Sequence, residues 1–297
     1  MMNRVVVGAR GSKLAQVQAK SVIDSLSELY PSINFTLISI STGGDRQTST
    51  SIDRLPGFGV FVKELEEALL DNHIDLAVHS LKDVPFQIPE GLTLAAILER
   101  IDPRDVIITR GETLEELKPA SVIGTGSPRR IAQLRGLRDD LLVKGIRGNV
   151  DTRLRKLAGG EYDGIMLAAA GMIRLGLQEN ITQFLPPEKF VPRAGQGVLC
   201  VETKAGSEAG KLVKPLDNIL TRSCVNAERA FEETMGGGCS AAVGCLCTTE
   251  GDLLKLSAMA AGKGEVYQST GEGEPASAEN AGRRLAEKLL KMGASGT

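Results

Sequence analysis

The sequence predicts an α/β protein made of two α/β domains followed by a small α+β domain. Short β-branched runs alternate with helical patterns over most of the chain, which is typical of sheets covered by helices. After about residue 216 this alternation gives way to one helix, several closely spaced strands and a closing helix. We therefore expect domain 1 at residues 1–99 and 195–215, domain 2 at 100–194, and domain 3 at 216–297.

Domain 1 is expected to contain a mostly parallel sheet, with functional side chains after the carboxyl ends of its strands. The predicted strands are residues 4–8, 33–40, 74–79 and 92–98, and helices are predicted to start near Ser12 and Phe61. A strand at residues 198–202 is expected to pair back into this sheet, which makes the domain discontinuous. Residues 41–59 are predicted to form a long polar loop, and such loops are usually either functional lids or disordered.

The pattern restarts near Asp102 and changes again in domain 3. For domain 2, the predicted strands are residues 106–109, 121–124, 141–143 and 164–168, with helices from Pro128 and over 149–158. For domain 3, we predict a helix over 225–235, alternating strands between 241 and 268, and a helix over 277–292.

Composition argues against several classes of protein. Aromatic residues make up only 3% of the 297 residues and the isoelectric point is near 5.9, which argues against a nucleic-acid binder. No apolar run approaches the ~18 residues that a membrane span requires. The N-terminal residues are too poor in apolar side chains for a signal peptide. The expectation is a cytoplasmic protein with neither nucleic acid nor membrane as a partner.

The five cysteines argue against a disulfide framework, because their number is odd and the expected location is intracellular. Four of them lie between residues 224 and 247, but none forms a Cys-x-x-Cys pair and neither histidine is nearby. No metal site is therefore expected, although a zinc-dependent C-terminal domain remains an alternative. Cys245 and Cys247 alternate along a predicted strand and are expected to be buried thiols.

A basic segment begins at Gly124-Thr-Gly-Ser-Pro-Arg-Arg130. Seven arginines lie within 27 residues, from Arg129 to Arg155, in a chain whose formal net charge is only −2. Ser127 is a preferred N-cap and Pro128 suits the first helical position, so free N–H groups are expected there, where anions bind well. Arginine pairs both oxygens of a carboxylate or phosphate and keeps its charge. The segment predicts an anion-binding site, and a solvated basic face is the alternative.

Other polar residues follow two predicted strands of domain 1. Arg10 and Ser12 lie between the first strand and its helix, where the alternative is an exposed turn. Lys82 and Asp83 follow a buried strand and precede a proline, where the alternative is a structural salt bridge. His79, within that strand, is expected to be a packed histidine rather than a catalyst.

Finally, a glycine-rich turn, Gly236-Gly-Gly-Cys239, carries one thiol, for which an ordinary turn cysteine is the alternative. Together and in this order, these segments resemble one family, the porphobilinogen deaminases, also called hydroxymethylbilane synthases. The matching segments are Ala9–Ala15, Phe61–Glu66, Asp75–Pro85, Asp102–Asp105, Gly124–Arg130, Arg147–Asn149, Thr152-Arg153, Tyr162-Asp163, Gly195–Gly197, Ala227–Arg229 and Gly237–Cys239.

The resemblance implies a fold of two domains like those of periplasmic binding proteins and a third domain that carries the cofactor cysteine. It implies a transferase of porphyrin and haem biosynthesis that joins four porphobilinogen molecules head to tail into the linear tetrapyrrole hydroxymethylbilane and releases ammonia. It also implies a dipyrromethane cofactor bound to Cys239 through a thioether. A cytoplasmic monomer with porphobilinogen as its substrate is expected.

The resemblance also assigns roles to individual residues. Asp83 matches the essential carboxylate that hydrogen-bonds pyrrole N–H groups, and Lys82 is the second catalytic residue implied. The cofactor-binding residues implied are Cys239, Lys82, Asp83, Thr125, Ser127, Arg129 and Arg130. The substrate-binding residues implied are Arg10, Ser12, Arg147, Arg153, Arg174 and Gln196.

The chemistry of that reaction agrees with the residues found here. Each porphobilinogen adds two carboxylates, so a growing pyrrole chain requires many fixed cations. Loss of ammonia from the substrate leaves a cation that an ionised Asp83 is expected to stabilise. A covalent tether holds the primer in place through repeated rounds.

The sequence also departs from the family pattern in several places. Phe58 stands where the loop usually has lysine, and Gly126 and Pro128 replace the usual serine and leucine. Arg193-Ala194 replaces the usual Ala-Val. None of these changes removes a residue with an assigned role. The main rival is a non-catalytic dicarboxylate-binding module of the same fold, which needs neither Cys239 nor Asp83.

Overall fold

The computed structural model describes residues 2–41, 62–237 and 241–295. Most of the predicted loop at 41–59, together with Phe58 and Cys239, lies outside these ranges. The chain divides into two compact units, Met1–Ile101 with Val198–Arg222, and Asp102–Gly197 with Ser223–Thr297. The exact division into three domains stays a prediction.

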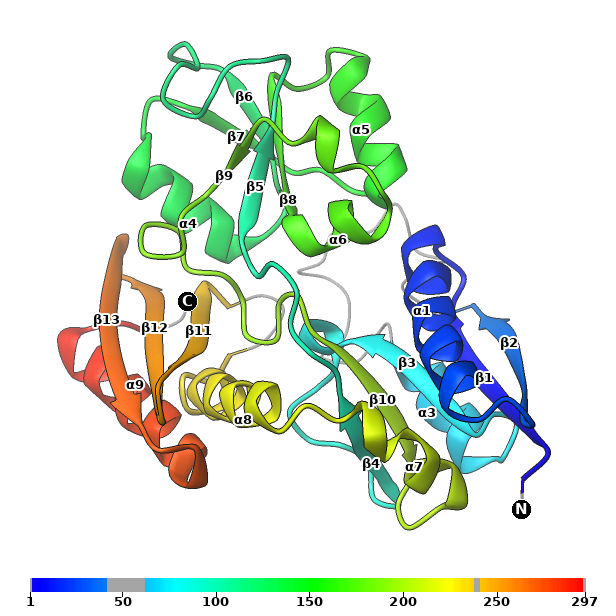
Figure 1. Ribbon diagram of the computed structural model, residues 1–297. Helices are drawn as coiled ribbons and strands as arrows, with labels where there is room; N and C mark the ends of the chain where they lie inside the picture. The colour runs from blue at the N-terminus through cyan, green and yellow to red at the C-terminus, as the bar shows by residue number, and fades with distance from the viewer. Residues whose placement is uncertain (1, 42–61, 238–240, 296–297) are drawn as a thin grey trace. The chain divides into compact units, whose positions relative to one another are not determined.

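The first unit is built on a five-stranded sheet with the order β2-β1-β3-β10-β4 (Figure 1). Its strands are β1 (Arg4–Arg10), β2 (Asn34–Ile40), β3 (Leu76–Ser80), β4 (Leu92–Ile97) and β10 (Leu199–Lys204). β1 pairs in parallel with β2 and β3, whereas β10 runs antiparallel to both β3 and β4. The prediction that the return strand pairs back into a mostly parallel sheet is confirmed.

The helices in the described part of the first unit each bury one apolar face. They are α1 (Lys13–Leu29), α3 (Lys63–Leu70) and α7 (Glu208–Val213). Helix α1 begins where the Ser12 hydroxyl accepts the backbone N–H of Ala15 at 3.3 Å, and it buries Ala19, Val22 and Leu26. These three side chains recur at the helical period, so α1 covers the apolar face of β1 and β3. The cap fixes where the chain turns from β1 into α1.

The second unit contains a five-stranded sheet with the order β7-β6-β8-β5-β9. Its strands are β5 (Asp105–Ile108), β6 (Val122–Gly124), β7 (Leu142–Lys144), β8 (Gly164–Ala168) and β9 (Gln183–Phe184). The helices of this part are α4 (Pro128–Leu137), α5 (Val150–Ala158) and α6 (Ala169–Arg174). β6 is parallel to β7 and β8, and β5 is antiparallel to β8 and β9. The carboxyl ends of β6, β7 and β8 therefore lie at one edge.

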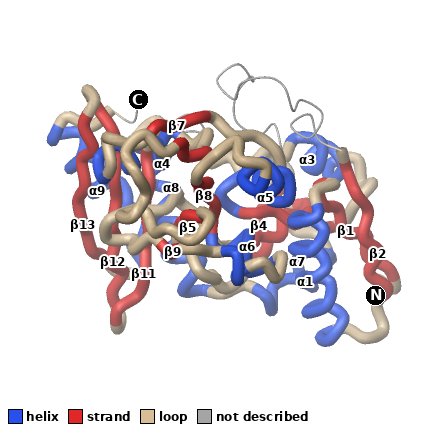
Figure 2. The backbone as a smooth tube through the Cα atoms, turned by 90° about the horizontal axis from the view of Figure 1, so that it is seen from above, coloured by secondary structure: helices blue, strands red, loops and turns tan. Residues whose placement is uncertain are grey.

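The same unit also contains a three-stranded antiparallel sheet, β11 (Val243–Glu250), β12 (Leu253–Gly262) and β13 (Glu265–Gly273). Helix α9 (Ala278–Met292) lies along β12 and β13 (Figures 1 and 2). Together with the two mixed sheets, this small sheet confirms the predicted fold class. None of the helices in the described ranges is both long and apolar enough to cross a membrane.

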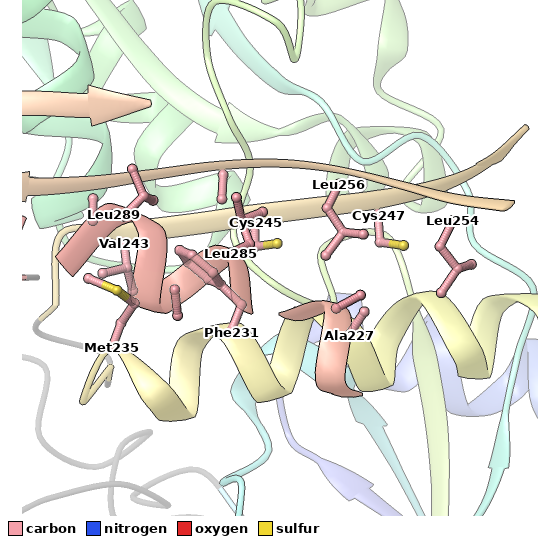
Figure 3. Packing of buried hydrophobic residues seen from close by; sticks show 14 of the residues in the cluster. Ala227, Phe231, Met235, Val243, Cys245, Cys247, Leu254, Leu256, Leu285 and Leu289 are labelled. Carbon is pink, nitrogen blue, oxygen red and sulfur yellow. The ribbon is translucent and has the colours of Figure 1, made fainter. Parts of the chain in front are cut away.

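Helix α8 (Ile219–Thr234) packs with α9 against the antiparallel sheet. Figure 3 shows Phe231 of α8 and Leu285 of α9 in one apolar core with Cys245 of β11. A Cβ atom at Gly282 of α9 would overlap the carbonyl oxygen of Ala227, so only glycine permits this close helix crossing.

The start of α8 differs from the prediction, which placed it at residue 225. The helix begins six residues earlier, at Ile219. The reason is a local cap, because the side-chain oxygen of Asn218 accepts the backbone N–H of Thr221 at 2.8 Å.

Candidate active site

The predicted site residues of the second unit follow the strands that end at one edge of its sheet. Thr125 and Ser127 follow β6, and Arg147 follows β7. Arg153 lies on α5, the helix after β7, and Arg174 ends α6, the helix after β8. Parallel strands place their carboxyl ends together, and functional residues of α/β sheets gather there.

The turn into α4 has the cap that the sequence predicts. The Ser127 hydroxyl accepts the backbone N–H of Arg130 at 3.5 Å, and Pro128 occupies the first helical turn. The Thr125 hydroxyl accepts the backbone N–H of Ser127 at 3.3 Å, and Thr125 is fully buried. The N-terminus of α4 is thereby held at the sheet edge, with Arg129 and Arg130 in its first turn.

Both arginines converge on a buried carboxylate, Asp105, at the start of β5. Arg129 Nη1 lies 2.8 Å from Asp105 Oδ2, and Arg130 places Nε and Nη2 at 2.9 and 2.6 Å from Oδ1. Asp105 is fully buried, and the two arginines are only 3% and 7% exposed. Sequence reasoning missed this role of Asp105. The signal for it in the sequence is an acidic residue at the start of an apolar strand, within the Asp102–Asp105 segment.

The electrostatics of this cluster hold Asp105 in its ionised form. Burial alone would raise the pKa of Asp105, but the charges of Arg129 and Arg130 outweigh it and lower the pKa to about 2. The arginines also donate to backbone oxygens, Arg129 to Val191 at 2.6 Å and Arg130 to Met166 at 3.0 Å. Two guanidinium groups surround one carboxylate, so the cluster retains an excess of positive charge.

Arg153 adds to this excess. Its Nε donates to the backbone oxygen of Gly148 at 2.8 Å. Burial, followed by the nearby charges of Arg130 and Arg147, lowers the pKa of Arg153 to about 10. Cations that repel one another at a sheet edge make a suitable environment for a polyanion.

The segment Ala194–Gly197 completes this edge. Gln196 is 1% exposed and donates to Pro103 O at 2.7 Å and to Asp105 Oδ1 at 3.2 Å. The backbone oxygen of Gly197 accepts a hydrogen bond from Arg174 Nη2 at 2.9 Å. Burial lowers the pKa of Arg174 to about 10. The structure thus brings Gln196 together with Asp105, and Arg174 with the same backbone segment.

The other predicted residues lie at the carboxyl edge of the first unit's sheet. Arg10 ends β1 and Ser12 caps α1, whereas Lys82 and Asp83 form a short 3-10 turn after β3. Lys82 and Asp83 are both half-buried. Because β1 and β3 are parallel, both turns leave the same edge. His79 is packed as predicted, with Nε2 3.1 Å from a buried carboxylate.

The described cysteines are buried thiols. Cys200, Cys224, Cys245 and Cys247 are all buried, as expected for Cys245 and Cys247. A hydrogen bond with Cys224, together with burial, raises the pKa of the Cys247 thiol. Within residues 2–41, 62–237 and 241–295, no cluster of three or more His, Cys, Asp or Glu side chains is placed to hold a metal ion. Thiols of this kind are chemically inert.

These features define an α/β protein in which arginines gather at one edge of the second unit's mixed sheet. A sequence model described as porphobilinogen deaminase, dipyromethane cofactor binding domain, matches residues 5–211, and one described as porphobilinogen deaminase, C-terminal domain, matches residues 222–291. The chain therefore belongs to the porphobilinogen deaminase family. It is an enzyme of tetrapyrrole biosynthesis and contains the dipyrromethane-binding domain of that family.

Relatives support this assignment over nearly the whole chain. The porphobilinogen deaminase of Chromobacterium violaceum is 44% identical over 297 residues, which cover 99% of this chain and 96% of the relative. The porphobilinogen deaminase of Roseiflexus castenholzii is also 44% identical, over 99% of this chain and 98% of the relative.

Among solved structures, the methionine-binding protein MetQ matches 72% of this chain and 89% of its own, with 13% identity and a TM-score of 0.46.

Proposed function

We propose that this protein joins four porphobilinogen molecules head to tail into hydroxymethylbilane, with release of ammonia, on a dipyrromethane primer linked to Cys239 by a thioether. The family assignment supports the reaction and the cofactor. The attachment residue, the roles of the site residues, a monomeric state and a cytoplasmic location are parts of the proposal.

The observation that carries the proposal is the excess of guanidinium charge around Asp105. One carboxylate is shared by Arg129 and Arg130, and the charges of Arg130 and Arg147 act on Arg153. A dipyrromethane and a growing pyrrole chain both carry several carboxylates. The donor set therefore fits such a ligand, because carboxylates bind best to arginine forks in partly desolvated sites.

The same geometry suggests how the two arginines act on the cofactor. Asp105 holds both guanidinium groups in fixed orientations, so neither has to be ordered when an acidic arm binds. Arg129 Nε is buried and has no hydrogen-bond partner among the described residues. We assign the acetate and propionate arms of the cofactor to Arg129 and Arg130, with Lys82, Thr125 and Ser127 as the further binding residues.

Other cations are assigned to the incoming substrate and the growing chain. Arg153 and Arg174 are partly desolvated and anchored through backbone oxygens, so their remaining N–H groups can pair with carboxylates. The full set of proposed substrate-binding residues is Arg10, Ser12, Arg147, Arg153, Arg174 and Gln196.

Asp83 is the proposed catalytic carboxylate. When bound, the dipyrromethane supplies the α-carbon that the first porphobilinogen joins. The Asp83 carboxylate accepts the pyrrole N–H and stabilises the positive charge that develops on the substrate as ammonia leaves. Its place in a short turn after β3 keeps it fixed and half-buried. Lys82, beside Asp83, holds the carboxylate arms of the cofactor.

Steady-state turnover tests this proposal. Asp83→Asn keeps the shape of the side chain but removes its charge, and loss of such a preorganised group typically costs about 10²–10³-fold in kcat. Asp71→Asn, at an exposed carboxylate that ends α3, is the matched control and should retain full turnover. Near-normal kcat in the Asp83 variant contradicts the role given to Asp83. A wild-type protein that binds dicarboxylates without consuming porphobilinogen would instead support the non-catalytic binding module.

A further inference from the structure

Two buried glutamates of α8 lie one helical turn apart and accept backbone N–H groups of the Ala194–Gly197 segment. Glu228 is fully buried, and its Oε2 accepts Gly195 N at 2.7 Å. Its other oxygen accepts Cys247 N of β11, also at 2.7 Å. Glu232 is 3% exposed, and its Oε1 accepts Ala194 N at 3.1 Å. One helix thus holds the segment through two consecutive amides.

The segment held in this way leads directly to the arginine site. Gly195 and Gly197 adopt φ angles of +71° and +87°, which glycine accepts without strain. Between them, Gln196 is aimed at Asp105. Gly197 offers its carbonyl oxygen to Arg174. The position of the backbone therefore fixes two proposed substrate-binding side chains, Gln196 and Arg174.

Glu232 is buried close to an arginine and to a backbone N–H group. Burial raises the pKa of Glu232, while the charge of Arg193 and the hydrogen bond from Ala194 N lower it in part. Arg193 Nε lies 4.0 Å from Glu232 Oε2. A buried carboxylate is costly unless it is paired or hydrogen-bonded, and Glu232 meets that condition through Ala194 N and Arg193.

We propose that Glu228 and Glu232 are positioning residues that hold Ala194–Gly197 so that Gln196 and Arg174 are ordered before substrate carboxylates bind. This inference rests on the proposed function for the identity of the substrate. The two glutamates hold the segment through side-chain oxygens that accept backbone N–H groups. A neutral side chain of the same shape with an oxygen acceptor can therefore replace either glutamate. A preordered site lowers the cost of binding, so the effect is expected in KM more than in kcat.

The test compares Glu232→Gln with Glu232→Leu. Gln keeps an oxygen acceptor, whereas Leu keeps the volume and removes it. We expect Glu232→Leu to raise KM for porphobilinogen about tenfold, which corresponds to one lost hydrogen bond to a charged group. Glu232→Gln should stay within about threefold of the wild type. Glu233→Gln, at the exposed neighbour on α8, should leave KM and kcat unchanged.

A second readout does not depend on turnover. Hydrogen–deuterium exchange of the Cys239→Ala protein, which carries no primer under the proposed attachment, should be faster across residues 194–197 when Glu232→Leu is added. With Glu232→Gln added instead, exchange across these residues should stay as slow as in the Cys239→Ala protein. Wild-type KM together with wild-type exchange in the Leu variant overturns the inference, as does an equal loss in the Gln and Leu variants. If the wild type fails to consume porphobilinogen, the proposed function fails, and the exchange result still decides the inference.

Discussion

Arg130 places both Nε and Nη2 on the same oxygen of Asp105, at 2.9 and 2.6 Å, and Asp105 is fully buried. This pair joins the first turn of α4 to the start of β5. Because β5 runs antiparallel to β8, the start of β5 lies beside the carboxyl end of β8. A buried ion pair therefore holds the first turn of α4 at this edge of the sheet.

Asp105→Asn should destabilise the protein strongly. The variant leaves Arg129 and Arg130 buried without their counter-charge, and breaking a buried ion pair from one side costs about 3–5 kcal/mol. Urea denaturation should show this loss in the free energy of unfolding. Asp252→Asn, at an exposed turn residue, should change it by less than about 0.5 kcal/mol. A stable Asp105→Asn protein would mean that the pair does not anchor the edge.

Asp105 should also give the protein a specific acid sensitivity. Its pKa falls from an ordinary 3.8 to about 2 in the folded protein, so its stabilising effect is present above pH 4 or so. That effect is lost as the pH falls through about 2. A plot of unfolding free energy against pH should fall between these values in the wild type, and more shallowly in Asp105→Asn. Parallel curves for the two proteins would contradict the lowered pKa of Asp105 as the source of the acid sensitivity.

Glu66 should respond to pH in the opposite direction. Burial, followed by the charge of Glu202, raises the pKa of Glu66. A raised pKa means that stability is full below the ordinary value and is lost as the pH rises through the folded-state value. Glu66→Gln should therefore have a higher Tm than the wild type at neutral pH, and the difference should shrink towards pH 4. Exposed Glu67→Gln is the control.

Arg153→Lys should weaken substrate binding although it keeps the charge. Lysine lacks the planar fork that pairs two carboxylate oxygens and cannot reproduce the Nε contact with Gly148. We expect KM for porphobilinogen to rise about tenfold. Arg155→Lys, on the exposed side of the same helix, should leave it unchanged. Equal KM values in both variants would remove Arg153 from the substrate site.

The features predicted best from the sequence depend on local patterns. Ser127 and Pro128 predict the start of α4. The alternation of Cys245 and Cys247 predicts a strand with both thiols buried. The start of α8 was missed because Asn218 caps it outside the apolar pattern. Asp105 was missed as an anchor because its partners lie about 25 residues along the chain.

The roles of Glu228 and Glu232 could not be predicted for a related reason. On a helix they have the pattern of ordinary polar residues, and only the fold shows that both are buried against the backbone of residues 194 and 195. Cys239, in contrast, is found only through its glycine-rich sequence and the family resemblance, because it lies outside the described residues.

Intact-mass spectrometry of the purified protein tests the central claim most directly. The wild type should carry an added mass equal to two linked pyrrole units. Cys239→Ala should lack both that adduct and activity, whereas Cys245→Ala, which removes a buried thiol of β11, should keep them. An unmodified wild-type protein that still converts porphobilinogen to the linear tetrapyrrole would contradict the claim.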